Sequence, residues 1–412
     1  MVNKIICIAG KNSISIAGLS YVLEHYSFGN SIYALCDVKD EGIDSWQPSY
    51  KKFATENGVK IVELDELYDV ENLVFISLEY FKLINPNKFK TGELFNIHFS
   101  LLPAYRGMYT SAHPILNEEK FSGCTFHCID SGIDTGDVIS QIKFEILQDD
   151  NCNDVYDKYL VHGIVLMHNT IGSLIENNFS SQLQPSIGSS YYSKRSIDYE
   201  NLKIDLAQNS DKISKNLRAY TFRDYQLPKI NGFEIFGHVI TDKKSKVPAG
   251  NIVQKNKDYF VISTNDFDMK LFIDNFESLV DAVSENHLQK VISILASNCH
   301  AINEKNESGW TPLIISTFNG YNDITYALLK VGADPNKANP KGTTPLMYAK
   351  DYALITGDLY GLEILLNWGA HTNLKDIYRK SIFDYLDEKS NYFEDVYDLL
   401  VNHKANKNSQ GN

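Results

Sequence analysis

The chain has 412 residues, more than one hydrophobic core usually holds, so the sequence predicts two or three domains. Its hydrophobic fraction of 43% and aromatic share of 12% exclude an intrinsically disordered protein. The 39 basic and 52 acidic residues give a formal net charge of -13, which disfavours a nucleic-acid partner or an acidic membrane surface. A small anionic ligand stays open, because a few local basic side chains or backbone N–H groups can bind it.

The six cysteines form no C-x-x-C pair and show no regular disulfide spacing, so we expect a reducing environment. The apolar start from Lys4 to Gly10 is short and strand-like, and no small-residue cleavage site follows it. The chain also has no apolar run of about 18 residues. These features predict a cytoplasmic protein without a membrane segment.

The first part of the chain alternates short apolar runs with helical patterns. Residues 5–9 are predicted to form a buried strand. It ends at Gly10-Lys11-Asn12-Ser13 and is followed by a predicted helix that ends near Tyr26. Further elements are expected in the same alternation, with strands at 32–36, 60–62 and 73–77 and a helix at 49–57. The alternation predicts an open, mostly parallel sheet.

Another strand is expected to end in Asn96-Ile97-His98. A strand at 124–128, a glycine-rich turn and a returning strand at 137–144 predict an antiparallel pair. A helix at 155–176 would close this first domain, which we place at residues 1–185. From there to residue 274, short alternating strands predict a small β-rich extension that includes a short helix at 210–221.

The last third contains an internal repeat. Gly309-Trp310-Thr311-Pro312-Leu313 recurs as Gly342-Thr343-Thr344-Pro345-Leu346, 33 residues later. A Leu-Leu pair and a Gly-Ala pair of one repeat also recur in the next, displaced by a few further residues, which an insertion at 353–358 can supply. The period and the Thr-Pro opening are typical of ankyrin repeats, which we expect over residues 275–403. The expected end pieces are a degenerate repeat at 276–303, a capping repeat at 378–402 and a polar tail at 404–412.

Asn96 and His98 lie two residues apart on a predicted strand, so both side chains leave one face and can meet a single reacting atom. Such a pair alone is more often a satisfied polar pair at a strand end. Three neighbouring motifs add weight: Ser100-Leu101-Leu102-Pro103, Tyr105-Arg106-Gly107 and Gly132-Ile133-Asp134-Thr135-Gly136.

With these motifs, about the first 220 residues resemble the folate-dependent formyltransferases. Tyr191-Tyr192-Ser193-Lys194-Arg195 and Leu217-Arg218-Ala219 are similar to the branch that modifies sugars. Phe99 departs from the proline of most of the family, but the sugar-nucleotide branch tolerates Phe, and Met108-Tyr109-Thr110-Ser111 resembles its dTDP-amino-sugar members. The resemblance implies an α/β Rossmann-like formyltransferase domain, followed by a small β-rich extension and an α-helical ankyrin-repeat domain.

The resemblance assigns Asn96, His98 and Asp134 as the catalytic residues. An amide such as that of Asn96 can stabilise the oxyanion formed when an amine attacks a formyl carbon. His98 can take the proton from the amine and pass it to the leaving nitrogen. Asp134 would hold and polarise the imidazole, although an Asp-Thr-Gly segment is by itself often a simple turn.

The formyl donor implied by the resemblance is 10-formyltetrahydrofolate, and no metal is expected. The residues expected to bind it, mainly through backbone groups, are Ser77, Glu79, Tyr80, Cys128, Ile129 and Asp130. The residues expected to bind the sugar nucleotide are Lys11, Asn12, Tyr105, Arg106, Met108 and Tyr109. Several of these residues also have a purely structural interpretation. Tyr80 would then be a core residue, Lys11 and Asn12 would only form a tight turn after Gly10, where a strand meets a helix, and Arg106 would form a surface salt bridge.

Cys124, His127 and Cys128 have the residue types of a zinc site, but strand alternation puts His127 on the opposite face from the two cysteines. We therefore expect no zinc. In the repeats, Trp310 is a candidate contact for an unknown ligand, although most aromatic residues in such repeats pack between helices.

The resemblance implies an acceptor such as dTDP-3-amino-3,6-dideoxyglucose, used in bacterial O-antigen lipopolysaccharide biosynthesis, and a homodimer formed through the β-rich extension. A dTDP-4-amino or UDP-4-amino sugar is the alternative acceptor. Methionyl-tRNA and glycinamide ribonucleotide formyltransferases share the catalytic residues, but the acidic charge disfavours tRNA and neither enzyme needs the repeats. An ankyrin scaffold with a retired catalytic domain is a different class, which the intact trio disfavours.

Overall fold

The computed structural model describes residues 4–297 and 300–409, with side chains as far as His403. Cys299 and the last three residues of the expected polar tail lie outside the described residues. The chain divides into two compact units, one of Met1–Asp44 with Pro48–Pro228 and one of Ser45–Gln47 with Lys229–Asn412. This division differs from the sequence-based boundary at residue 185, because the short strand Tyr191–Tyr192 pairs with a strand of the first unit.

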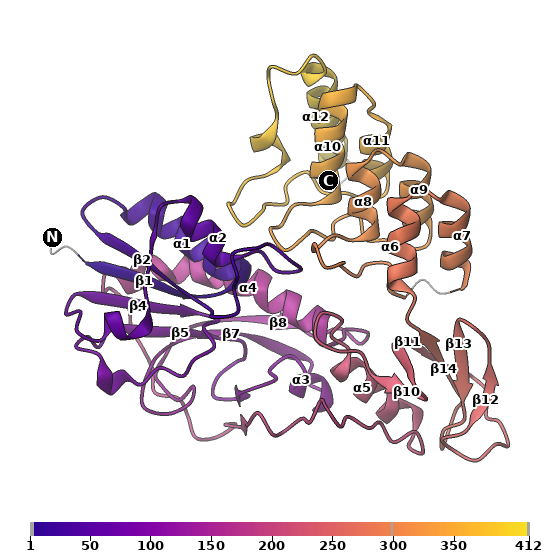
Figure 1. The fold of residues 1–412 in the computed structure, drawn as a ribbon, viewed down its shortest axis with the longest axis horizontal. Coiled ribbons are helices and arrows are strands. Elements are labelled where there is room, and N and C mark those ends of the chain that lie inside the picture. Colours follow the sequence, from indigo (N-terminus) through magenta and orange to yellow (C-terminus); the bar gives the residue numbers. More distant parts are fainter. Residues whose placement is uncertain (1–3, 298–299, 410–412) are drawn as a thin grey trace. The chain divides into compact units, whose positions relative to one another are not determined.

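A seven-stranded sheet forms the centre of the first unit, in the order β3-β2-β1-β4-β5-β7-β8 (Figure 1). The parallel strands are β1 (Ile5–Gly10), β2 (Ser31–Cys36), β3 (Lys60–Ile61), β4 (Leu73–Leu78) and β5 (Leu94–His98). The two antiparallel strands are β7 (Phe121–Cys128) and β8 (Val138–Glu145). The middle strands β1 and β4 are buried along almost their whole length and are nearly all apolar, as is typical of a sheet covered on both faces. The predicted mostly parallel α/β sheet is confirmed.

Three helices form one layer against this sheet, since α1 contacts both of the others. They are α1 (Asn12–Tyr26), α2 (Tyr50–Glu56) and α4 (Cys152–Ile175). The opposite face carries a cluster that includes Cys7, Phe75 and Leu94 and is covered by loops and by the 3-10 turn η1 (Leu64–Leu67). A second 3-10 turn, η2 (Pro86–Lys88), lies between β4 and β5.

The chain from 186 to 228 packs within the first unit. Its short strand β9 (Tyr191–Tyr192) pairs with β6 (Arg106–Gly107), and α5 (Ser210–Tyr220) contacts α3 (His113–Leu116) and α4. For this reason the β-rich region begins only at Lys229 rather than near residue 186.

The second unit opens with a five-stranded antiparallel sheet in the order β10-β11-β14-β13-β12. Its strands are β10 (Lys229–Ile230), β11 (Phe233–Ile240), β12 (Ile252–Lys255), β13 (Tyr259–Ile262) and β14 (Met269–Ile273). Phe236 of β11 packs against the apolar core of the helices that follow, and the ring of Phe272 lies 4.2 Å from that of His300. The sheet and the first helical repeat therefore share one core.

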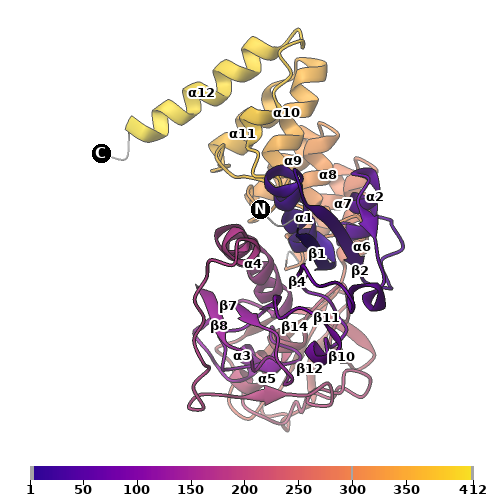
Figure 2. The ribbon, with the colours of Figure 1, turned by 90° about the vertical axis from the view of Figure 1, so that its left-hand side faces the viewer.

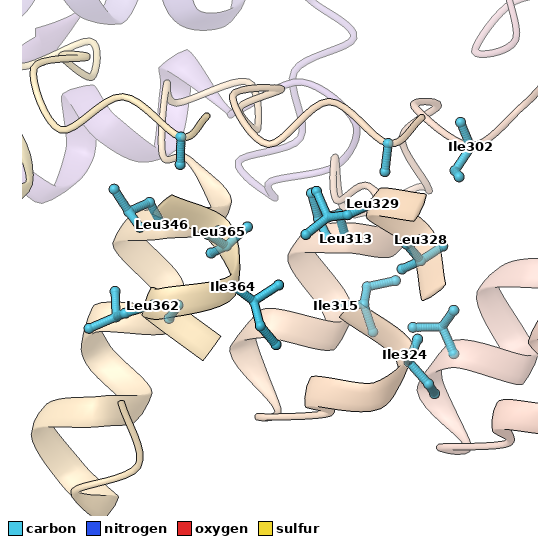
Figure 3. Close-up of a cluster of buried hydrophobic side chains, with 14 of the residues drawn as sticks. Ile302, Leu313, Ile315, Ile324, Leu328, Leu329, Leu346, Leu362, Ile364 and Leu365 are labelled. Carbon is cyan, nitrogen blue, oxygen red and sulfur yellow. The ribbon is translucent and has the colours of Figure 1, made fainter. Parts of the chain in front are cut away.

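Paired helices follow and lie side by side in both Figure 1 and Figure 2. The helices are α6 (Phe276–Ser284), α7 (Leu288–Ser297), α8 (Pro312–Phe318), α9 (Asn322–Lys330), α10 (Pro345–Thr356), α11 (Tyr360–Asn367), the 3-10 turn η3 (Ile382–Tyr385) and α12 (Phe393–Ser409). Leucine and isoleucine side chains from successive helices interlock in the core, as Figure 3 shows. The predicted ankyrin repeats are confirmed.

Local rules explain where these repeat helices begin. The hydroxyls of Thr311 and Thr344 accept hydrogen bonds from the backbone N–H groups of Ile314 and Met347, and proline follows each threonine. The expected insertion lengthens α10 to 12 residues, against 7 in α8, and Gly357 ends the helix in a left-handed conformation. None of the helices in the described ranges is both long and apolar enough to cross a membrane.

Candidate active site

Three parallel strands of the first unit end side by side, at Gly10, Leu78 and His98. The strand order reverses between β1 and β4, and open α/β sheets bind ligands at such a point. A cavity of about 760 Å³ lies here. A Cβ on Gly10 would come within 1.9 Å of the carbonyl oxygen of Leu78, so only glycine allows the two strands to approach this closely.

The cavity brings together the three residues that the sequence assigned to catalysis. Asn96 and His98 enter it from β5, and Asp134 enters from the turn between β7 and β8. The Nδ1 atom of His98 lies 3.5 Å from Oδ2 of Asp134, and both side chains are largely buried. An amide, an imidazole and a carboxylate thus face one enclosed space.

The Gly-x-Asp-x-Gly turn holds Asp134 by close packing. A Cβ on Gly136 would lie 1.8 Å from the carbonyl oxygen of Cys128, so the chain can return to β8 only with glycine there. Asp130 accepts hydrogen bonds from Gly132 N (3.1 Å) and from Thr135 Oγ1 (2.7 Å). These contacts fix the turn whose apex presents the Asp134 carboxylate to the cavity.

Hydrogen bonds assign the roles of the two His98 nitrogens. Nε2 lies 2.8 Å from the carbonyl oxygen of Tyr105, which can only accept, so Nε2 carries a proton. Nδ1 faces Asp134 and is the nitrogen that can take up a second proton. Gly107 N donates to Asp134 Oδ2 at 2.9 Å, so one short segment orients both the imidazole and the carboxylate.

His127 is a member of the site that the sequence analysis considered only as a metal ligand. It lies opposite Asn96 in the antiparallel β5–β7 register, and its Nε2 is 3.1 Å from the Asn96 amide nitrogen. Its Nδ1 lies 2.8 Å from the carbonyl oxygen of Cys128, so the proton is on Nδ1 and Nε2 accepts from Asn96. Burial lowers the pKa of His127 to about 4 although Asp134 opposes the shift, so the ring is neutral at physiological pH.

This arrangement orients the Asn96 amide. One of its two N–H groups is bound by His127, which leaves the second to donate to a ligand oxygen.

Of the residues considered as zinc ligands, Cys124 is turned toward the carbonyl oxygen of Tyr159. The described residues contain no group of three or more His, Cys, Asp or Glu side chains that could hold a metal ion.

Five of the six residues predicted to bind folate line the cavity: Ser77, Glu79, Tyr80, Ile129 and Asp130. Cys128 does not line it, and its thiol is hydrogen-bonded to Ser181. Tyr80 and Ile129 also pack against the apolar cluster on that face of the sheet, so Tyr80 is at once a core residue and a wall of the cavity. Phe81 continues this wall, and the sequence analysis missed only its further residues Lys82, Leu83 and Ile84.

Of the predicted sugar-nucleotide residues, Lys11, Met108 and Tyr109 line the cavity. The other three do not line it, and their direct contacts with a sugar nucleotide stay a prediction. The Asn12 amide donates to Glu79 and Tyr156, the Tyr105 hydroxyl donates to Glu119, and the Arg106 guanidinium donates to Gln184. Arg106 therefore bonds to a side-chain amide and not to a carboxylate, as the alternative of a surface salt bridge would have required.

An ion pair joins the chain after β1 to the chain after β4. Lys11 Nζ lies 3.3 Å from Glu79 Oε1, and Tyr156 OH donates to the same carboxylate at 3.0 Å. Burial disfavours the charge of Lys11, but Glu79 and Tyr225 outweigh it and raise the pKa of the ammonium to about 12. Lys11 therefore stays charged, with part of its charge balanced by Glu79.

Left-handed backbone conformations gather around the cavity. Non-glycine residues rarely adopt positive φ, yet five do so here: Asn12 (55°), Glu79 (66°), Tyr105 (59°), Tyr109 (59°) and Asp134 (53°). Such conformations persist only where surrounding contacts hold them, and they cluster at functional sites. Backbone strain thus marks the same region as the catalytic residues.

The predicted contact residue of the repeats, Trp310, is half-buried in a cluster of aromatic rings. Its ring centroid lies 4.9 Å from that of Phe318 and 5.1 Å from that of Tyr348. A packing role for Trp310 follows, and a role in ligand binding stays a prediction.

Known proteins resemble both parts of the chain. The formyl transferase family matches residues 39–171, and three copies of the ankyrin repeat match residues 279–376. WlaRD, a sugar 3N-formyltransferase solved in the presence of dTDP and 5-N-formyl-THF, is 39% identical, with 67% of this chain and 99% of that chain covered and a TM-score of 0.60. An N-formyltransferase from Helicobacter canadensis, solved with folinic acid and dTDP-3-aminofucose, is 37% identical, with coverages of 66% and 100% and a TM-score of 0.60.

Methionyl-tRNA formyltransferases also match the chain. The one from Clostridium tetani is 28% identical over 235 residues, which make up 52% of this chain and 74% of that protein. Together with the cavity that holds Asn96, His98 and Asp134, these likenesses identify the chain as a member of the formyltransferase family that also carries ankyrin repeats.

Proposed function

We propose that the protein transfers the formyl group of 10-formyltetrahydrofolate to the amino group of a dTDP-linked amino-dideoxyhexose, specifically dTDP-3-amino-3,6-dideoxyglucose. The meeting of Asn96, His98 and Asp134 in one cavity carries the proposal. The acceptor class rests on the two similar solved structures, whose ligands include dTDP and dTDP-3-aminofucose. The net charge of -13 argues against tRNA, the substrate of the other relatives.

The residues on one side of the cavity suit the folate donor. Tyr80, Phe81, Ile84 and Ile129 provide an apolar and aromatic wall that can contact a flat heterocycle. Asp130 and the backbone of the 128–134 turn add polar groups at its edge. When bound, the donor supplies the formyl carbon that the acceptor amine attacks.

The side chains can then perform the transfer. As the amine nitrogen bonds to the formyl carbon, the free N–H of Asn96 stabilises the negative charge on the formyl oxygen. His98 Nδ1 takes the proton that the amine sheds, and Asp134 stabilises the resulting imidazolium. When the bond from carbon to the folate nitrogen breaks, His98 returns the proton to that nitrogen, so protons balance over the cycle.

A direct assay tests the proposal. The purified protein is mixed with 10-formyltetrahydrofolate and a panel of dTDP-3-amino, dTDP-4-amino and UDP-4-amino sugars, with methionyl-tRNA as the competing acceptor. A mass gain of one formyl group on a dTDP-3-amino sugar is the expected result. Formylation of tRNA would replace the proposal, and no transfer to any acceptor would favour a scaffold with a non-catalytic domain.

We further propose that the enzyme acts in O-antigen biosynthesis in the cytoplasm as a homodimer. The nucleotide-linked form of the acceptor supports this setting, because such sugars are activated for transfer to a growing polysaccharide. Light scattering tests the oligomeric state, and a monomer mass would contradict it.

A further inference from the structure

The proposed transfer needs two separate parts of the chain to be held against each other. One is the loop after β5, where the carbonyl oxygen of Tyr105 accepts a hydrogen bond from His98 Nε2. The other is the turn between β7 and β8, which carries Asp134. The distance of 3.5 Å between His98 Nδ1 and Asp134 Oδ2 therefore depends on how the loop and the turn are fixed to each other.

The side-chain amide of Gln184 joins the loop to the turn. Its Oε1 accepts two hydrogen bonds from the guanidinium of Arg106 in the loop, from Nε at 3.1 Å and from Nη2 at 2.7 Å. Its Nε2 donates to the carbonyl oxygens of Asp134 at 2.9 Å and of Gly136 at 2.7 Å. A guanidinium can only donate and a carbonyl can only accept, so these partners fix the orientation of the amide. Both donor positions and both acceptor positions of the amide are used.

The backbone beside Gln184 is anchored to the same turn. Two residues earlier, Gln182 exchanges two backbone hydrogen bonds of 2.8 Å with Val138, the first residue of β8. Neither glutamine lines the cavity, and both lie beyond the residues 39–171 that match the formyl transferase family. An effect of Gln184 on the reaction must therefore act through the residues that it holds.

The backbone conformation of the turn explains why it needs this support. Asp134 has a φ of 53°, a left-handed value that is uncommon outside glycine and that persists where contacts hold it. The Asp130 carboxylate accepts from Gly132 N and fixes the first half of the turn. Gln184 bonds to the carbonyl oxygens of Asp134 and Gly136 and fixes the second half. The catalytic carboxylate thus leaves the backbone in the half that Gln184 holds.

We propose that Gln184 is a positioning residue for formyl transfer, because its amide holds the turn of Asp134 against the loop that orients His98. This inference rests on the proposed function. Gln184 does not line the cavity, so the loss of its bonds should leave the binding of both substrates nearly intact. The proton transfers by His98 depend on the placement of Asp134, and a misplacement of about 1 Å can cost about 10²-fold in rate. The loss should therefore lower kcat and leave the KM values nearly unchanged.

The test compares Gln184→Glu with Gln182→Glu in the full-length protein. The two variants carry the same substitution and the same change of charge, two residues apart in the chain. At position 184 a carboxylate can still accept from Arg106 but cannot donate, so both hydrogen bonds to the turn are lost. At position 182 the hydrogen bonds to Val138 come from the backbone and are kept. Gln182→Glu is therefore the matched control.

We expect Gln184→Glu to lower kcat at least about tenfold, with KM for the dTDP-amino sugar and for 10-formyltetrahydrofolate within about twofold of wild type. Gln184→Ala should show a comparable fall, which would exclude the added charge as its cause. Gln182→Glu should keep kcat near the wild-type value. An unchanged kcat in both variants of Gln184, or a rise in KM alone, would overturn the inference.

Hydrogen exchange of backbone amides separates this inference from the proposed function, because it needs no substrate. Gly107 N donates to Asp134 Oδ2 at 2.9 Å, so its exchange reports whether the turn stays against the loop. In protein made with isotope-labelled glycine, Gly107 should exchange at least about tenfold faster in Gln184→Glu, whereas Gly163 inside α4 should exchange as in wild type.

Wild-type exchange at Gly107 in Gln184→Glu would overturn the inference. An equal acceleration at Gly163 would also overturn it, because it would indicate a general loss of stability. If the wild-type protein formylates no acceptor while Gly107 responds as expected, the proposed function is wrong and the hold of Gln184 on the turn stands.

Discussion

The cavity of the first unit and the helical repeats of the second differ in the residues that adopt left-handed backbone. In the repeats Asn286 and Arg379 adopt it, but most such positions are glycine, which adopts positive φ at no steric cost: Gly309, Gly320, Gly332, Gly342, Gly357 and Gly369. Around the cavity most are other residues: two tyrosines and a glutamate, which rarely adopt positive φ, beside an asparagine and an aspartate, which adopt it more readily. The backbone of the repeat turns is thus set mainly by the local sequence, whereas the backbone around the cavity is held by tertiary contacts.

The largest expected effect is the loss of transfer in His98→Ala and Asn96→Ala. Without His98 the amine has no proton acceptor, and kcat should fall about 10² to 10⁴-fold. Without the Asn96 donor the fall should be about 10² to 10³-fold. A coupled assay of formyl transfer measures both, with circular dichroism to check the fold.

Near-normal turnover in either variant would contradict the assigned roles. An equal fall in kcat in a variant of the repeats with the same stability would remove the distinction between the two units, because it would make the repeats part of the reaction.

A second test substitutes one glycine in each unit. Gly107→Ala brings a Cβ against Tyr192 O and shifts the loop that orients Asp134, so kcat/KM should fall at least about tenfold. Gly332→Ala has equally positive φ but nothing within 4 Å of the new Cβ, so it should cost about 1 kcal/mol of stability and no activity.

Steady-state kinetics and thermal unfolding of the two glycine variants give the comparison. Equal effects on activity would show that the strain at Gly107 is unrelated to the site.

Acid should weaken the first unit. Burial lowers the pKa of His113 and of His127 to about 4, whereas an unfolded histidine takes up a proton near pH 6.5. As the pH falls from about 6.5 to about 4, the unfolded state binds protons that the folded state refuses, so stability falls over that window. We expect Tm to drop by several degrees between pH 7 and pH 5.

His113→Gln should reduce this drop, because the variant removes one of the two groups. A Tm that is flat across the same range would contradict this account, because it would mean that the folded protein takes up protons as readily as the unfolded chain.

The smallest expected effect is that of a helix cap in the repeats. Thr344→Ala removes the hydroxyl that accepts from Met347 N and should lower the free energy of unfolding by about 1 kcal/mol. Thr344→Ser keeps the hydroxyl and should stay near wild type. Denaturant unfolding measures both, and kcat should not change in either.

The same contrast explains what the sequence could predict. A Thr-Pro pair begins a repeat helix and a Gly-Ala pair follows one, and both effects are local in the chain, so the repeats could be recognised from the sequence directly. Asn96 and His98 could be placed on one face because strand side chains alternate with a period of two. The residue types and their spacing are enough in such cases.

Other features depend on residues far apart in the chain. His127 meets Asn96 only through the register of β5 and β7, which the long connection between them sets. Arg106 bonds to Gln184, 78 positions later, and nothing beside Arg106 in the sequence indicates that partner. The segment 186–228 packs within the first unit for the same reason, since its pairing with β6 is not local.

The anchoring of Tyr105 has a practical consequence. Its carbonyl oxygen accepts from His98, and its N–H donates at 2.8 Å to the hydroxyl of Ser190. A shortened protein cut where the family match ends would retain Asn96, His98 and Asp134 but lose Ser190. The Tyr105 segment that orients the imidazole would lose this tether, so we expect such a fragment to carry every catalytic side chain and still be inactive.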